Sequence, residues 1–180
     1  MSITTKHGDR GRTRLLFGSQ VGKEHPALAA VGEVDELNAV LGLARLHVQR
    51  ADLREILARA QDDIVGLMGQ LSAGGENAAR YAESGFRRVE PQAVDRLTAE
   101  GAALEGEFPD GFRTWSVPGA AGSAGGAWLE FARCVCRRAE RAVAVLSASG
   151  ARVDEVIPAW LNRLSDVLWL CARGEEKPEI

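Results

Sequence analysis

The chain contains little that would direct it to a membrane, to the cell exterior or to a disulfide-stabilised fold. Its 180 residues include only three cysteines, Cys134, Cys136 and Cys171, with no CxxC pair. Their apolar helical surroundings favour buried, reduced thiols over disulfides or a zinc site. The N-terminal string MSITTKHGDRG has no apolar segment typical of a secretion signal, and no apolar run is long enough to span a bilayer. We therefore expect a cytoplasmic protein without a membrane partner.

A strong positive charge is also missing. The formal net charge is -3, which gives no electrostatic reason to expect nucleic acid as a partner. The basic residues nevertheless gather in two short segments, residues 6–14 and 133–141. A mildly acidic chain with two such clusters favours a small polyanion as its ligand.

The apolar periodicity predicts an all-α fold, a single domain over residues 1–180 that forms a five-helix bundle. Residues 1–27 are polar and rich in glycine, and they predict an extended arm with at most a short strand. The bundle is expected over residues 28–173. Asp52 is the expected N-cap of the second helix, and residues 73–90 are expected to be a connection. The helices are expected at roughly 29–49, 52–72, 91–106, 124–148 and 153–173.

A long glycine-rich loop is expected before the fourth helix. The string FPDGFRTWSVPGAAGSAGGAW carries two prolines and five glycines. A loop of this length inside a compact domain is usually functional or mobile.

The arm carries the string TKHGDRGRT. Its glycines allow backbone N–H groups to face an anion, while its basic and hydroxyl side chains can neutralise and bind that anion. A solvated chain terminus is the alternative interpretation. The string is not a Walker A loop, because it lacks the GxxxxGK spacing. The residues concerned are Thr5, Lys6, Gly8, Arg10, Gly11, Arg12 and Thr13.

The first helix carries the string GEVDELN. Asp35, Asn38 and Gly42 lie on one helix face, because they are spaced by three and four residues. Acidic residues in a first helical turn also stabilise the helix dipole. Both interpretations of Glu33, Asp35 and Glu36 remain open on this pattern alone.

The fourth helix carries the string ARCVCRRAER. Arg133, Arg137 and Arg141 repeat every four residues along one face, and Glu140 lies close to Arg137. Like charges at this spacing repel each other, whereas phosphates or carboxylates between arginine forks would relieve the repulsion. The stripe therefore favours a polyanion site over a solvated charged face.

The last helix carries the string LNRLSD. A polar stripe of Asn162, Ser165, Asp166 and Arg173 interrupts an otherwise apolar helix. Buried polar groups need hydrogen-bond partners. A network between helices and a ligand contact explain the stripe equally well.

Taken together, these strings resemble the PduO-type ATP:cob(I)alamin adenosyltransferase family. The family pattern TK-x-GD-x-G-x-T, VDELN, ARTVCRRAER and LNRLSD is matched in the same order by TKHGDRGRT, VDELN, ARCVCRRAER and LNRLSD. The resemblance implies a homotrimer with active sites between adjacent subunits. It also implies transfer of the 5′-deoxyadenosyl group from ATP to the cobalt of cob(I)alamin or a related corrinoid, with release of triphosphate.

The resemblance also implies roles for individual residues. Asp35 would pair across the interface with Arg133, and these two residues together with Arg137 would be catalytic. Mg²⁺ would assist at the triphosphate, and a flavoprotein reductase is a possible partner. ATP would be bound by Thr5, Lys6, Gly8, Asp9, Gly11, Thr13 and Lys23 of one subunit and by Arg133, Arg137, Glu140 and Asn162 of its neighbour.

The chain departs from the family pattern on the corrinoid side. Trp115 occupies the position of an aromatic residue, usually phenylalanine, that displaces the lower axial ligand of cobalt. The loop after Pro118 is longer than usual, and Glu130 or a near neighbour replaces a histidine region. The alternative function is therefore a divergent member that binds ATP or a tetrapyrrole without corrinoid adenosylation, as a carrier, a regulator or a transferase to another acceptor.

Overall fold

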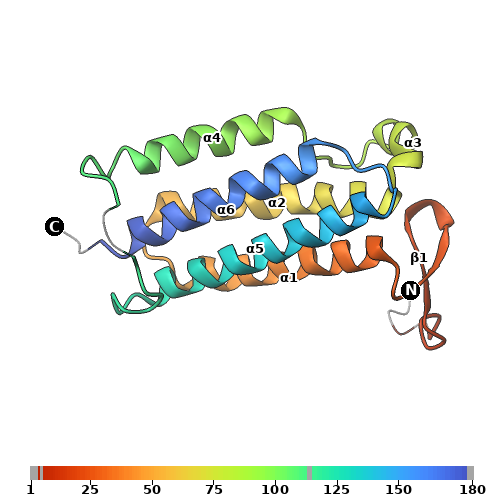
Figure 1. Ribbon diagram of the computed structural model, residues 1–180, viewed down its shortest axis with the longest axis horizontal. Coiled ribbons are helices and arrows are strands. Elements are labelled where there is room, and N and C mark those ends of the chain that lie inside the picture. The colour runs from red at the N-terminus through yellow and green to blue at the C-terminus, as the bar shows by residue number, and fades with distance from the viewer. Residues whose placement is uncertain (1–3, 5, 113–114, 178–180) are drawn as a thin grey trace.

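Five long helices run lengthwise beside one another and form the body of the molecule (Figure 1). The computed structural model describes residues 4, 6–112 and 115–177. Helix α1 packs against α2 and α5, while α6 packs against α5 and α4. The all-α bundle predicted from the sequence is confirmed. The long helices are α1 (Pro26–His47), α2 (Ala51–Ala73), α4 (Pro91–Glu105), α5 (Ala124–Ala148) and α6 (Val156–Glu175).

The apolar stripes of the long helices meet in one core. Leu37 of α1, Leu57 of α2 and Leu164 of α6 are fully buried, and burying each such side chain contributes about 1.5–3 kcal/mol. Trp160 is the largest fully buried side chain. Its indole N–H donates a hydrogen bond to Asp63 Oδ2 at 2.9 Å, which satisfies the one polar group of the ring.

The expectation of five helices missed a sixth. The segment expected as a connection contains a 3₁₀ turn, Gly75–Asn77, followed by the short helix α3, Ala78–Glu83. Six residues make fewer than two turns, so they cannot show an apolar repeat. Tyr81 is the one buried residue of α3, and its hydroxyl donates to the carbonyl oxygen of Arg87 at 2.5 Å.

Three expected helix starts are also wrong. Helix α1 begins at Pro26, three residues earlier than expected. Helix α2 begins at Ala51 with Arg50 as its N-cap residue, so Asp52 lies inside the first turn and not at the cap. The Arg50 guanidinium binds the Asp52 carboxylate at 2.6 Å. Helix α6 begins at Val156, three residues later than expected, and the Asp154 side chain accepts a hydrogen bond from the Val156 N–H at 3.2 Å.

The N-terminal arm forms a small hairpin beside the start of α1. Strand β1 (Arg12–Arg14) pairs antiparallel with β2 (Gln20–Gly22), so the arm contains two short strands where at most one was expected. The Leu16 N–H donates to Ser72 Oγ of α2 at 3.1 Å, and the Arg80 guanidinium lies 4.2 Å from the centre of the Phe17 ring. These contacts hold the hairpin at one end of the bundle (Figure 1).

The opposite end of the bundle is closed by ion pairs. Arg50 binds Glu107 at 2.8 Å, and Lys177 Nζ lies 3.6 Å from the same carboxylate. The hydrogen bond from Arg50 is the main reason why the pKa of Glu107 is lowered. Glu107 thereby fixes the start of the loop that joins α4 to α5. No helix in the described ranges is long and apolar enough to cross a membrane.

We predict that Glu107→Gln lowers the free energy of unfolding by about 1 kcal/mol at neutral pH, because it removes a partly exposed charge-assisted pair. A carboxyl group with a lowered pKa stabilises the fold above its unfolded pKa of about 4.3, and this stabilisation is lost as the pH falls through the folded value. Urea unfolding at pH 7 and below pH 4 should show the difference between the two proteins disappear in acid.

The exposed neighbour Glu105 provides the matched control, since Glu105→Gln should have little effect at either pH. A destabilisation by Glu107→Gln that stays constant across this pH range would contradict the electrostatic explanation.

Candidate functional site

The arginine stripe lies on the face of α5 that turns away from the core. Ser123 caps the helix by accepting a hydrogen bond from the Gly126 N–H at 2.9 Å. The apolar side of α5 is buried, which leaves Arg137 and Arg141 exposed and Arg133 half-buried. Among the described residues, the Arg137 and Arg141 guanidinium groups have no hydrogen-bond or ion-pair partner. They are therefore available to bind an anion.

The neighbouring Arg138 has a structural role. Its guanidinium binds the carboxylates of Glu33, at 2.5 Å, and of Glu36. Hydrogen bonds to these two carboxylates raise the pKa of Arg138. These ion pairs connect α5 to α1.

The same contacts correct one interpretation of the GEVDELN string. Helix α1 begins at Pro26 and has no acidic residue in its first turn, so Glu33 and Glu36 are too far along the helix to act on its N-terminal dipole. They serve helix packing instead. Asp35 lies between them in sequence but is exposed, and it has no ion-pair partner within the described part of the chain.

Two predicted site residues from different helices meet beside the arginine stripe. The Asn162 side-chain amide of α6 donates to Glu140 Oε1 of α5 at 3.3 Å. Of the other residues in the polar stripe on α6, Ser165 donates to the backbone carbonyl of Asn162, and Asp166 pairs with Arg163.

Arg133 has a buried partner that the sequence analysis did not assign. Its Nε donates to Glu130 Oε2 at 2.8 Å, and the other Glu130 oxygen accepts from Arg173 Nη2 at 2.8 Å. The spacing of three residues between Glu130 and Arg133 was a usable signal. The expected pairing of Arg133 with Asp35 joins two subunits, and it stays a prediction.

The arm brings its predicted ligands together in a tight turn. The Lys23 N–H donates to the Gly11 carbonyl at 2.9 Å, and the Lys23 side chain folds over Gly8, where an added Cβ atom would lie 3.1 Å from Nζ. Gly11 has a φ of +71°, a conformation that favours glycine. Of the other arm residues, Lys6 and Asp9 are exposed, Thr13 is half-buried, and Thr5 lies outside the described residues.

Trp115 lies at the far end of the bundle from the arm. It belongs to the loop between α4 and α5 and is 88% exposed. The next residue, Ser116, donates to Glu176 Oε2 at the end of α6 at 3.4 Å. In one chain the predicted site is therefore divided. The arm lies at one end of the bundle, the loop between α4 and α5 lies at the other, and α5 runs between them (Figure 1).

Two of the three cysteines, Cys136 and Cys171, are buried free thiols. Burial raises the pKa of Cys136 and of Cys171 above the ordinary range of a thiol. The expectation that all three are buried is wrong for Cys134, which is exposed. The described residues contain no group of three His, Cys, Asp or Glu side chains that could hold a metal ion.

A separate pocket of about 350 Å³ lies beside the base of the arm. Leu15, Tyr81 and Ile157 contribute to its lining, together with Arg88 and Asp154. It contains none of the predicted site residues, so we place the candidate site on the arginine face of α5 and not in this pocket.

Comparison with known proteins relates the chain to a single family. The family model described as cobalamin adenosyltransferase matches residues 3–175. The corrinoid adenosyltransferase PduO of Salmonella typhimurium is 34% identical over 179 residues, which cover 98% of this chain and 50% of that protein. A cobalamin adenosyltransferase of Cupriavidus metallidurans is 38% identical over 95% of this chain and 86% of its own length.

A solved structure supports the same grouping. A variant PduO-type ATP:corrinoid adenosyltransferase from Lactobacillus reuteri, complexed with cobalamin and ATP, superposes with a TM-score of 0.84 at 26% identity, covering 96% of this chain and 92% of that one. The chain spans about half the length of the PduO proteins that it matches. The chain belongs to the cobalamin adenosyltransferase family.

Proposed function

We propose that this protein transfers the 5′-deoxyadenosyl group of ATP to the cobalt of cob(I)alamin or a related corrinoid. The observation that carries the proposal is the row of arginines on α5, in which Arg137 and Arg141 have no partner among the described residues and Arg137 is exposed beside the Glu140–Asn162 pair. Family membership supports it, as does the similarity to a structure that contains both cobalamin and ATP.

In the proposed reaction, the electron pair of cobalt(I) attacks C5′ of ATP. The cobalt–carbon bond forms while the C5′–oxygen bond breaks, and the bonding electrons leave with the triphosphate. The cobalt is itself the nucleophile, so the chain needs to align the two substrates and stabilise the charge that builds on the leaving group. Arg133, Arg137 and Lys23 are suited to the second task.

Mg²⁺ is part of the proposal as a counter-ion of the triphosphate. This small cation keeps much of its water and is often held by one or two carboxylates together with phosphate oxygens. The arm offers Asp9, an exposed carboxylate beside the proposed triphosphate ligands Lys6 and Gly8.

A homotrimer with shared sites would bring the separated residues together. The arm of one subunit would close over the arginine face of the next, and Asp35 would meet Arg133 across the interface. Exposed apolar side chains on α1 and α5 support an assembly surface: Leu43 is 39%, Leu46 79% and Phe131 45% exposed. In a closed ring, each interface repeats the same contact.

The corrinoid side of the site is proposed to lie near Trp115. An indole that is 88% exposed in one chain would be covered when the corrinoid binds. It could keep water and the lower axial ligand away from cobalt. A flavoprotein reductase in a reducing cytoplasm would supply electrons for cobalt(I).

Binding of ATP or a tetrapyrrole without adenosyl transfer is the second candidate function. The observation that favours it is the large side chain at Trp115, which could also fill the space that the corrinoid needs.

We predict that Arg137→Ala reduces turnover at least about 100-fold, because it removes a preorganised donor to the leaving triphosphate. The assay follows the visible spectrum of purified protein with Mg-ATP and chemically reduced cob(I)alamin under anaerobic conditions. Arg87→Ala is the control, since Arg87 is exposed and pairs with Asp62 away from the stripe. Unaltered kinetics in Arg137→Ala would remove this residue from the site.

We further predict that Trp115→Phe keeps or raises activity, whereas Trp115→Ala loses corrinoid turnover with unchanged ATP affinity. The aromatic ring, and not the indole N–H, is expected to exclude ligands from cobalt. Turnover and ATP binding should be measured on both variants. An inactive Trp115→Phe protein that still binds ATP would show that the corrinoid side is built around the indole.

A further inference from the structure

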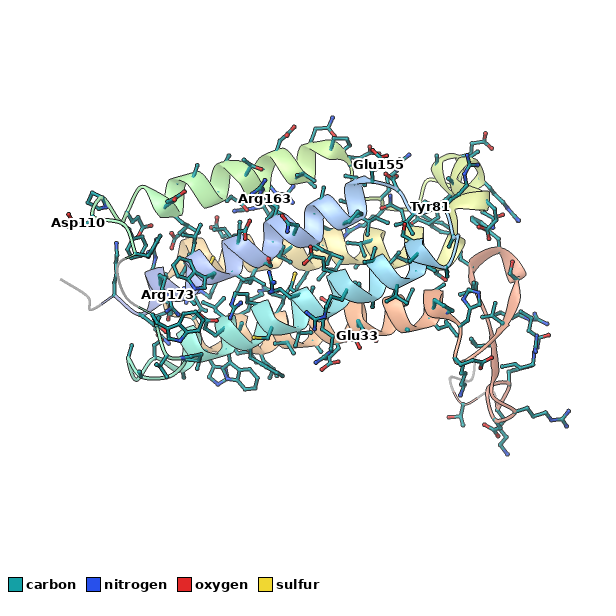
Figure 2. The ribbon with its side chains drawn as sticks, viewed as in Figure 1. Glu33, Tyr81, Asp110, Glu155, Arg163 and Arg173 are labelled. Carbon is teal, nitrogen blue, oxygen red and sulfur yellow. The ribbon has the colours of Figure 1, made fainter. Side chains whose placement is uncertain are left out.

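A buried network of charges connects Arg133 to the end of α6. Glu130 accepts from Arg133 with one carboxylate oxygen and from Arg173 with the other, each at 2.8 Å. Arg173 Nη2 also binds Glu176 at 3.1 Å. Figure 2 shows Arg173 at the end of the bundle opposite the arm.

The members of this network differ in how far they reach the solvent. The side chains of Glu130 and Arg173 are 5% and 6% exposed, whereas that of Arg133 is 27% exposed. A buried carboxylate needs partners, since an unpaired charge in the interior is strongly unfavourable. Arg173 supplies this compensation from another helix. Glu130 is therefore a fixed acceptor, and Arg133 is the only one of these three that extends outward.

The close approach of α6 to α5 depends on the glycines at the start of α5. A Cβ atom at Gly126 would lie 2.8 Å from Glu176 Cγ, and one at Gly125 would lie 2.8 Å from Glu175 Oε1. The small residues allow the end of α6, with Arg173 and Glu176, to lie against the first turn of α5. The position of Glu130 is thus determined by helix packing.

The contact with Glu130 uses only one edge of the Arg133 guanidinium. The Nε atom is engaged by the carboxylate, while Nη2 has only a long contact of 3.8 Å to the Cys134 sulfur. A guanidinium is a planar fork, so holding its Nε restricts where the two terminal nitrogens point. Those terminal nitrogens are the donors that a phosphate or a carboxylate would bind in bidentate fashion.

We propose that Glu130, anchored by Arg173, is a positioning residue that orients Arg133 toward the triphosphate of ATP. The inference rests on the proposed function, because the ligand of Arg133 is taken to be ATP. Glu130 touches neither substrate and acts only through Arg133. Its loss should therefore have no effect on ATP once Arg133 itself is gone.

The test is a double-mutant cycle on the full chain, with Glu130→Gln, Arg133→Ala and the double variant. Mg-ATP affinity is measured by titration calorimetry, so the readout does not require corrinoid turnover. Glu130→Gln keeps the shape of the side chain but cannot accept both guanidinium groups as a carboxylate does. It should raise the Kd about tenfold, the effect of one charge-assisted hydrogen bond.

The double variant should bind ATP no more weakly than Arg133→Ala alone. Multiplication of the two single effects would show that Glu130 acts independently of Arg133, and an unchanged Kd in Glu130→Gln would show that it does not position the arginine. Either result would overturn the proposal. Glu100→Gln is the matched control, because it removes a carboxylate whose side chain is 13% exposed and which pairs with Arg59, away from the stripe.

A second variant keeps the test decisive if Glu130→Gln does not fold. Replacing the buried pair together, Glu130→Met with Arg173→Met, removes both buried charges at once, a change that is often tolerated. Glu176 loses Arg173 in this protein but keeps the hydrogen bond from Ser116. This protein should show the same tenfold loss of ATP affinity, and wild-type affinity would overturn the proposal. Failure of the wild-type chain to bind ATP would instead contradict the proposed function, and the positioning role with it.

Discussion

The candidate site depends on which face of α5 is buried in the bundle and which faces stay outside the core. A helix in a bundle buries only one stripe, so its remaining faces must meet solvent, a ligand or another chain. In α5 the apolar stripe is buried against α1 and α6. The arginines fall outside it and take three different roles. Arg138 connects two helices, Arg133 is held by a buried carboxylate, and Arg137 has no partner in the part of the chain that the structure describes.

This division explains why the candidate site is incomplete in one chain. The rigid helices provide a fixed row of cations, while the hairpin of the arm extends from one end of the bundle. Among the described residues, no hydrogen bond or ion pair joins the hairpin to that row. Phosphate binding needs donors from several directions. We therefore propose that a second chain supplies the remaining donors.

The parts of the fold that follow from local periodicity could be predicted from the sequence. Helix α5 spans 124–148 as expected, because 25 residues contain many repeats of the apolar pattern. Helix α3 and the two strands of the arm could not be predicted from the sequence. Elements of six or three residues are too short to show an apolar repeat. The start of α2 was misplaced because Asp52 resembles a cap but serves as a partner of Arg50.

The site was predictable to the extent that its residues share one helix. The repeat of four residues places Arg133 and Arg137 on one face without any knowledge of tertiary structure. The pair of Glu130 and Arg173 is different, because 43 residues separate its members. Its formation depends on how closely α6 approaches α5, and spacing along the chain does not report that distance.

We propose that each site is completed by two subunits, and mixed trimers test this arrangement most directly. Lys23→Ala impairs the arm and Arg137→Ala impairs the helix face, so each variant alone should be inactive with Mg-ATP and cob(I)alamin. Trimers purified through two different affinity tags contain both kinds of subunit. If sites are shared around a ring, one site of each mixed trimer has an intact arm and an intact helix face, and activity should return to roughly one-third of the wild-type level. Mixed trimers as inactive as the two parent variants would contradict sites that are shared between subunits.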